Sequence, residues 1–103
     1  MPNLHRGEIE AILDDKTYTL CLTLGALAEL ENCLGADDLI ALTERFENGR
    51  MKSSDITHII CAGLKGGGHD VDINEVSRMK VDDGAVGYIN IAVRLLKATF
   101  HGE

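Results

Sequence analysis

The segment over about 84–100 constrains the fold of this chain more than any other part. Its apolar residues recur around most of a helix, and its polar residues fall on one narrow stripe at helical spacing: Asn90, Arg94, Lys97 and His101. A helix with so little polar surface must be packed on several sides. We therefore interpret it as the core helix of the domain. Alternatively, part of its apolar surface is exposed in the monomer and binds a partner.

The N-terminal region has the alternating pattern of a β-hairpin. Residues 6–13 and 17–23 flank Asp14-Asp15-Lys16, a short polar connection suited to a hairpin turn. Alternation places these residues on one apolar face: Ile9, Ala11, Leu13, Tyr18, Leu20 and Leu22. Because a lone hairpin is marginally stable in water, we expect helices to cover this face.

Two helices are predicted directly after the hairpin. Thr23 is a suitable N-cap for a helix over 24–34, which Gly35 ends. The residues predicted to share its buried stripe are Leu24, Leu27, Leu30 and Leu34. A second, short helix is predicted over 37–47, because Asp37 and Asp38 suit the positive end of a helix.

Two more helices are predicted before the C-terminal one. Ser53 or Ser54 caps the first of them, and Gly66-Gly67-Gly68 ends it. Its apolar face contains Ile56, Ile59, Ile60 and Leu64, and its polar face contains Asp55, His58 and Lys65. Asp72 and Glu75 have the spacing of a capping box, which predicts a short helix over 73–80.

These patterns predict a single α+β domain over 1–103. It has an N-terminal β-hairpin followed by four to five α-helices, and it is mostly helical. Hydrophobic residues make up 45% of the chain but aromatic residues only 4%, so the core must consist of Leu, Ile, Val and Ala.

The net charge of −7 argues against a nucleic-acid partner, because binding to phosphates depends on Lys and Arg. Residues 1–38 contain eight acidic residues against Arg6 and Lys16, and therefore carry most of that charge. The simplest interpretation of this acidic surface is a solvated face that keeps the protein in solution. The more specific prediction is that it binds a basic protein partner through Glu29, Glu31, Asp37 and Asp38.

The three cysteines, Cys21, Cys33 and Cys61, are odd in number and widely spaced, so we expect them to be reduced. No apolar run is long enough to span a bilayer. The expected location is the cytoplasm, with no membrane partner, and incorporation into a particle is the alternative.

No motif predicts catalysis, and we expect no enzyme activity, cofactor or metal. The tract from Lys65 to Asp70 follows a helix and lacks the ending of a phosphate-binding loop, so it is interpreted as a flexible connection. His58 and Cys61 share a helix, but close pairs of metal ligands are absent. The prediction is therefore that no metal or catalytic site forms around Cys21, Cys33, Cys61, His58 and His69.

Several runs resemble one known family in order along the chain. They are His5 to Ala11, Tyr18 to Glu31, Gly35 to Leu39, Arg45-Phe46, Ile59 to Leu64, Gly68 to Val71 and the late apolar helix. In these runs the chain is similar to a family of small proteins encoded in gene transfer agent and phage tail clusters, commonly described as a tail tube protein. The similarity covers nearly the whole chain and contains no catalytic signature.

The resemblance implies a non-enzymatic role in building a phage-like tail. Small helical proteins of tail clusters include assembly chaperones, which shield the tape-measure protein until the tube polymerises around it. The prediction is therefore a chaperone or adaptor for the tape-measure protein, and the alternative is a structural tail tube subunit retained in the particle. The implied partners are the tape-measure or tube protein, and a homo-oligomer remains open.

Overall fold

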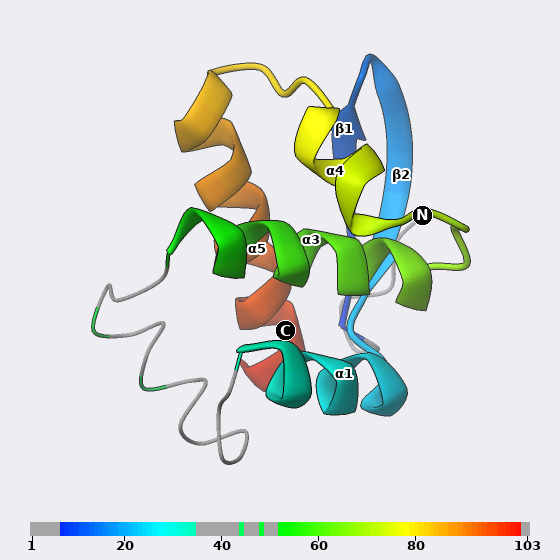
Figure 1. Cartoon of the computed structure of the whole chain (residues 1–103), viewed down its shortest axis with the longest axis vertical. Coiled ribbons are helices and arrows are strands. Elements are labelled where there is room, and N and C mark those ends of the chain that lie inside the picture. The colour runs from blue at the N-terminus through cyan, green and yellow to red at the C-terminus, as the bar shows by residue number, and fades with distance from the viewer. Residues whose placement is uncertain (1–6, 35–43, 45–47, 49–51, 102–103) are drawn as a thin grey trace.

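The fold consists of an N-terminal β-hairpin and helices that cover one face of it (Figure 1). The computed structural model describes residues 7–34, 44, 48 and 52–101. The elements are β1 (Glu8–Leu13), β2 (Lys16–Cys21), α1 (Leu24–Leu34), α3 (Ser53–Gly66), α4 (Ile73–Arg78) and α5 (Gly84–His101). This arrangement confirms the predicted mostly helical α+β fold. Apart from residue 44, the predicted helix over 37–47, with Asp37 and Asp38, lies outside the described residues.

A tight turn sets the register of the hairpin. Asp14 and Asp15 both have positive φ, 52° and 63°, as a two-residue type I′ turn requires. Leu13 therefore pairs directly with Lys16, and β2 begins one residue earlier than predicted. The predicted apolar face is confirmed, because its members are buried or half-buried: Ile9, Ala11, Leu13, Tyr18, Leu20 and Leu22.

The hairpin turn is tied to the loop between α4 and α5. The Asp14 backbone N–H donates to the Lys80 carbonyl at 2.8 Å. In return, the Lys80 backbone N–H donates to Asp14 Oδ1 at 2.8 Å. These two bonds join positions far apart in the sequence and fix the tip of the hairpin.

Neighbouring backbone covers the outer edge of β2. Because Leu13 and Lys16 form the hydrogen-bonded pair at the turn, the carbonyls of Thr19 and Cys21 point outward. The end of α3 lies against them so closely that a Cβ on Gly66 would collide with the Cys21 oxygen, and one on Gly67 with the Thr19 oxygen. The glycine tract, predicted as a flexible connection, thus contains two close-packing positions.

α1 matches its predicted bounds and cap. The Ala26 backbone N–H donates to the Thr23 hydroxyl at 3.1 Å, as expected for an N-cap. Leu27 and Leu30 are buried, but Leu24 is 80% exposed. The prediction was wrong for Leu24 because the buried face is centred on Ala26, Leu27 and Leu30, and Leu24 points away from it in the first turn.

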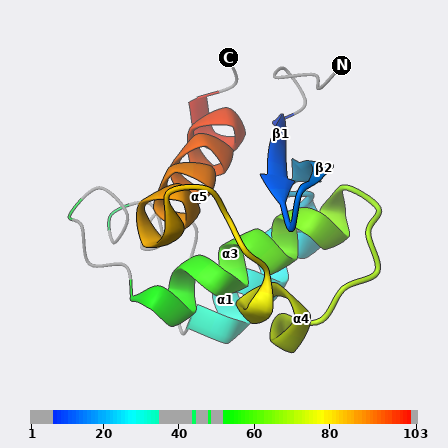
Figure 2. The ribbon, with the colours of Figure 1, turned by 90° about the horizontal axis from the view of Figure 1, so that it is seen from above.

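α3 is the central helix, since it contacts α1, α4, α5 and β2 (Figure 2). Ile59, Ile60 and Leu64 are fully buried, as predicted. The cap differs from the prediction, because Lys52 occupies that position and its backbone N–H donates to Asp55 Oδ2 at 2.9 Å. This bond explains why Asp55, predicted on the polar face, is only 7% exposed.

α4 begins with the predicted capping box. The Glu75 N–H donates to Asp72 Oδ1 at 2.8 Å, and the Asp72 N–H donates to Glu75 Oε1 at 3.3 Å. The helix ends at Arg78, two residues earlier than predicted, and Met79 continues as extended backbone.

α5 contributes both to the core and to the surface. Ile91, Leu95 and Leu96 are buried, whereas the predicted polar residues Asn90, Arg94 and Lys97 are exposed. Two apolar residues of its first half, Val86 and Ile89, are 60% and 47% exposed. The helix therefore packs in the core, as the first interpretation stated, and part of its apolar surface is exposed, as the alternative stated. Binding of a partner to that exposed surface stays a prediction.

Candidate protein-interaction surface

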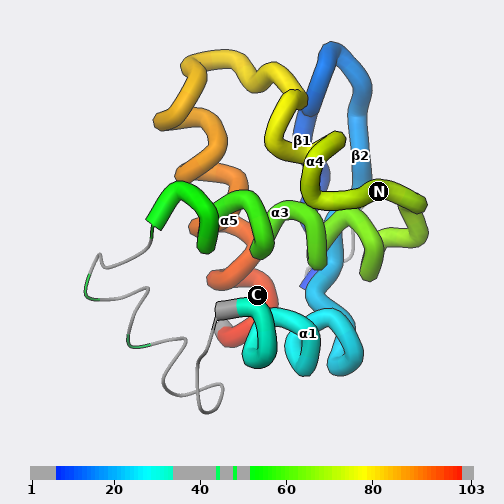
Figure 3. The backbone as a smooth tube through the Cα atoms, viewed as in Figure 1, coloured from blue at the N-terminus to red at the C-terminus, as the bar shows by residue number. Residues whose placement is uncertain are grey.

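A groove of about 360 Å³ lies where α1, α3 and the start of α4 meet. α1 and α3 run side by side in opposite directions along it (Figure 3). The groove is lined by Glu29, Leu30, Asn32, Cys33, His58, Cys61, Ala62, Lys65, Asp72 and Ile73. We call it the α1–α3–α4 groove. Its floor is apolar, because Leu30, Cys61 and Ala62 are buried there.

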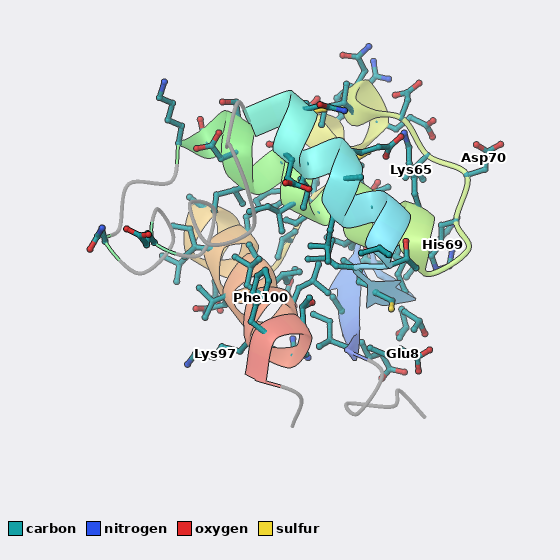
Figure 4. The ribbon with its side chains drawn as sticks, turned by 90° about the horizontal axis from the view of Figure 1, so that it is seen from below. Glu8, Lys65, His69, Asp70, Lys97 and Phe100 are labelled. Carbon is teal, nitrogen blue, oxygen red and sulfur yellow. The ribbon has the colours of Figure 1, made fainter. Side chains whose placement is uncertain are left out.

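The charged groups of this groove are two carboxylates and one amine. Glu29 comes from α1 and Asp72 from the cap of α4. Lys65 lies near the end of α3 (Figure 4). All three side chains are exposed at the rim. The groove is therefore an apolar floor with a net acidic rim.

The structure separates the acidic residues that were predicted to act together. Glu29 lines the groove, but Glu31 does not. Two residues along a helix correspond to about 200° around its axis, so Glu31 lies on the other flank of α1. Glu31 is also half-buried, whereas Glu29 is exposed. Asp37 and Asp38 lie outside the described residues.

The tertiary fold brings two cysteines and a histidine to one place. Cys33, His58 and Cys61 all line the α1–α3–α4 groove, with Cys33 exposed and Cys61 buried. Spacing along the chain does not bring Cys33 to Cys61, because the two residues lie on different helices. In contrast, Cys21 lies on the hairpin, and His69 makes an edge-on ring contact with Tyr18 at a centroid distance of 4.8 Å.

Within the described residues, no group of three or more His, Cys, Asp or Glu side chains is arranged to hold a metal ion. The prediction that no metal site forms remains to be tested. Metal analysis of protein purified without chelator would contradict it if stoichiometric zinc were found and lost on substitution of Cys33 and Cys61.

A second groove, of about 330 Å³, lies between β1 and the first half of α5. Its lining includes Glu10, Ile12, Asn90 and Arg94. The Arg94 guanidinium crosses it and donates to the Glu10 carbonyl at 2.7 Å. This bond occupies an outward carbonyl on the edge of β1, so an intramolecular contact already uses part of the groove.

A family model described as phage tail tube protein, GTA-gp10, matches residues 6–102. The chain belongs to this family. The match confirms the resemblance found in the sequence and places the protein in a phage tail tube family, which is a structural family. Neither the curated proteins nor the solved structures gave a significant match. In the described part of this GTA-gp10 family member, no helix is both long and apolar enough to cross a membrane.

Electrostatics in the groove act on the buried thiol of this tail protein. Burial raises the pKa of Cys61 above its ordinary value, and the carboxylates of Glu29 and Asp72 raise it further, while Lys65 opposes them. The groove thus disfavours a negative charge at its floor.

Burial also raises the pKa of Tyr88 on α5, and Asp14 adds to that effect.

The raised pKa of Cys61 predicts a pH dependence of stability. The unfolded chain loses the thiol proton near pH 8.5, whereas the folded protein retains it to higher pH. The stabilisation that the protonated Cys61 thiol gives the fold is therefore complete below the pKa of this thiol in the unfolded chain. It is lost as the pH rises through the pKa of the thiol in the folded protein. We expect urea denaturation between about pH 7 and pH 10 to show a smaller loss of unfolding free energy in Cys61→Ala than in the wild type. Cys33→Ala is the control, and equal pH profiles for wild type and Cys61→Ala would contradict the prediction.

Proposed function

We propose that this protein acts in assembling a phage-like tail, as a chaperone or adaptor that binds the tape-measure protein. Membership of the GTA-gp10 tail family supports the role in the tail. The family also implies contact with other tail proteins. The finer role is supported by how the hairpin is held.

The observation that carries the proposal is that contacts within the chain occupy outward carbonyls on both hairpin edges. A tube wall built as a sheet running from one subunit to the next needs edges that can pair with another strand. On β2, the outward carbonyls of Thr19 and Cys21 lie against the backbone at the end of α3. On β1, the outward Glu10 carbonyl accepts from Arg94. A second copy could extend the sheet along β2 only after the end of α3 had moved, and along β1 only after the Arg94 side chain had left the Glu10 carbonyl, which favours a protein that binds through its helices.

The second candidate is a structural tail tube subunit that remains in the particle. The family description names the tail tube and therefore supports this candidate more directly than the chaperone. In that role the protein would oligomerise, and its subunits would have to meet through surfaces other than the hairpin edges, or rearrange those edges on assembly.

The composition of purified particles separates the two candidates. A chaperone leaves the tail when the tube closes, so we expect this chain to be absent from mature particles or far below the amount of the tube protein. Quantitative mass spectrometry of intact particles provides the measurement. Recovery in stoichiometric amounts would favour the structural subunit and overturn the chaperone proposal.

Co-expression tests the partner directly. In the presence of this protein, the tape-measure protein is expected to become more soluble and to co-purify with it. The major capsid protein, expressed in the same way, serves as the control for nonspecific capture. If the tape-measure protein shows no co-purification at any salt concentration, it is not the partner.

A further inference from the structure

We propose that the α1–α3–α4 groove binds an amphipathic helical segment that places apolar side chains on the groove floor and Lys or Arg side chains beside Glu29 and Asp72. The inference rests on the proposed function, which makes the tape-measure protein the source of that segment. It goes beyond that function by assigning the contact surface and the chemistry of the segment that occupies it.

The floor and size of the groove suit side-chain anchors. Leu30 and Ala62 are buried at the floor, and Ile73 of α4 is half-buried beside them. A volume of about 360 Å³ accommodates a few large apolar side chains. An amphipathic helix presents such anchors at intervals of three and four residues, and grooves between helices bind them in this way. A few well-buried anchors usually supply most of the affinity of such contacts.

The rim selects the charge of the segment. Glu29 and Asp72 outnumber Lys65 among the charged residues that line the groove. Lys65 lowers the pKa of Cys61 and the two carboxylates raise it, so the charges of the rim act on the groove floor. A basic segment is attracted both by this rim and by the net charge of −7, whereas an acidic one is repelled.

The same charge argument disfavours a second copy of this chain as the occupant. Two copies that each carry −7 repel one another, and a symmetric contact through this groove would bring two acidic rims together. The favoured occupant is therefore a basic segment of a different protein.

Glu29 and Glu31 provide a matched pair of variants for the test. Both lie on α1 and both change charge by two when replaced with lysine, but only Glu29 lines the groove. With the co-purified tape-measure protein as the probe, we expect Glu29→Lys to weaken binding about tenfold at low salt and less at high salt. Glu31→Lys is expected to change binding no more than about twofold.

The exposed thiol of Cys33 gives a second measurement on the unmodified chain. Cys33 lies at the groove and is exposed, so N-ethylmaleimide should alkylate it readily in the isolated protein. Bound tape-measure protein is expected to slow this alkylation at least about fivefold, the level of a clearly covered site. Cys21 lies on the hairpin, outside the lining of the groove, and its rate should not change.

The outcomes distinguish the groove from the broader proposal. If the complex forms but Cys33 is not protected, or if Glu29→Lys and Glu31→Lys weaken it equally, the groove inference is overturned and the proposed function stands. If the wild-type protein forms no complex, both are overturned. Thermal unfolding of Glu29→Lys checks that the fold of this variant is intact. Light scattering measures self-association of the wild type and of Glu29→Lys. Self-association that is present in the wild type and lost in Glu29→Lys would assign the groove to a second copy of the chain.

Discussion

Replacing Gly66 with alanine is expected to lower the free energy of unfolding by about 3 kcal/mol, the upper part of the range for overpacking. Its Cβ would collide with the carbonyl oxygen of Cys21, which belongs to the backbone of β2 and cannot rotate away. The clash can be relieved only by moving the end of α3 away from β2. Since a domain of this size has a total stability of about 5–15 kcal/mol, this is a large effect.

Gly25→Ala is the matched control for this experiment. Gly25 is also helical, but a Cβ there would meet only the Thr23 hydroxyl oxygen at 4.0 Å. Alanine is the better helix former by roughly 0.8–1 kcal/mol, so this variant should be slightly more stable than the wild type. Urea denaturation of both variants measures the difference. A Gly66→Ala protein as stable as the wild type would show that α3 and β2 are not in such close contact.

Replacing Leu95 with alanine is expected to cost about 2–5 kcal/mol, because it leaves a cavity in the core. Leu95 on α5 is fully buried. Its Cδ2 atom lies only 2.5 Å from where a Cβ on Gly63 of α3 would be placed, so the missing side chain of Gly63 leaves room for Leu95. This pair of residues joins the two longest helices of the described structure.

The contact between Gly63 and Leu95 predicts non-additive effects. Gly63→Ala alone should destabilise the protein by roughly 1–3 kcal/mol through overpacking. In the double variant the new methyl group enters space that Leu95 has vacated, so the combined loss should be smaller than the sum by at least about 0.5 kcal/mol. A double-mutant cycle by urea denaturation measures this coupling. Strict additivity would mean that the two side chains do not share this space.

Features that depend on neighbouring residues were predictable from the sequence. The strand alternation predicted the buried face of the hairpin, and Asp14 with Asp15 predicted its turn. Thr23 predicted the start of α1, and Asp72 with Glu75 predicted the start of α4. Each of these signals involves partners within three or four residues, so the local sequence specifies it.

The same local reasoning failed where a residue depended on distant partners. Leu24 has the right residue type for a buried stripe, yet the direction of α1 turns it to solvent. The glycine tract has the composition of a flexible connection, but Gly66 and Gly67 pack against β2. Neither outcome follows from spacing, because each depends on how one element packs on another.

The sequence by itself determined the mostly helical α+β fold, the hairpin, the caps of α1 and α4 and the family, since these reside in local patterns and in the order of residues along the chain. Only the tertiary structure decided that α3 is central and that Glu29, but not Glu31, lines a groove. It also decided that Cys33 and Cys61 share that groove. The physical reason is that composition and periodicity give the faces of each helix, whereas the packing of α1 and α4 on α3 selects which residues meet.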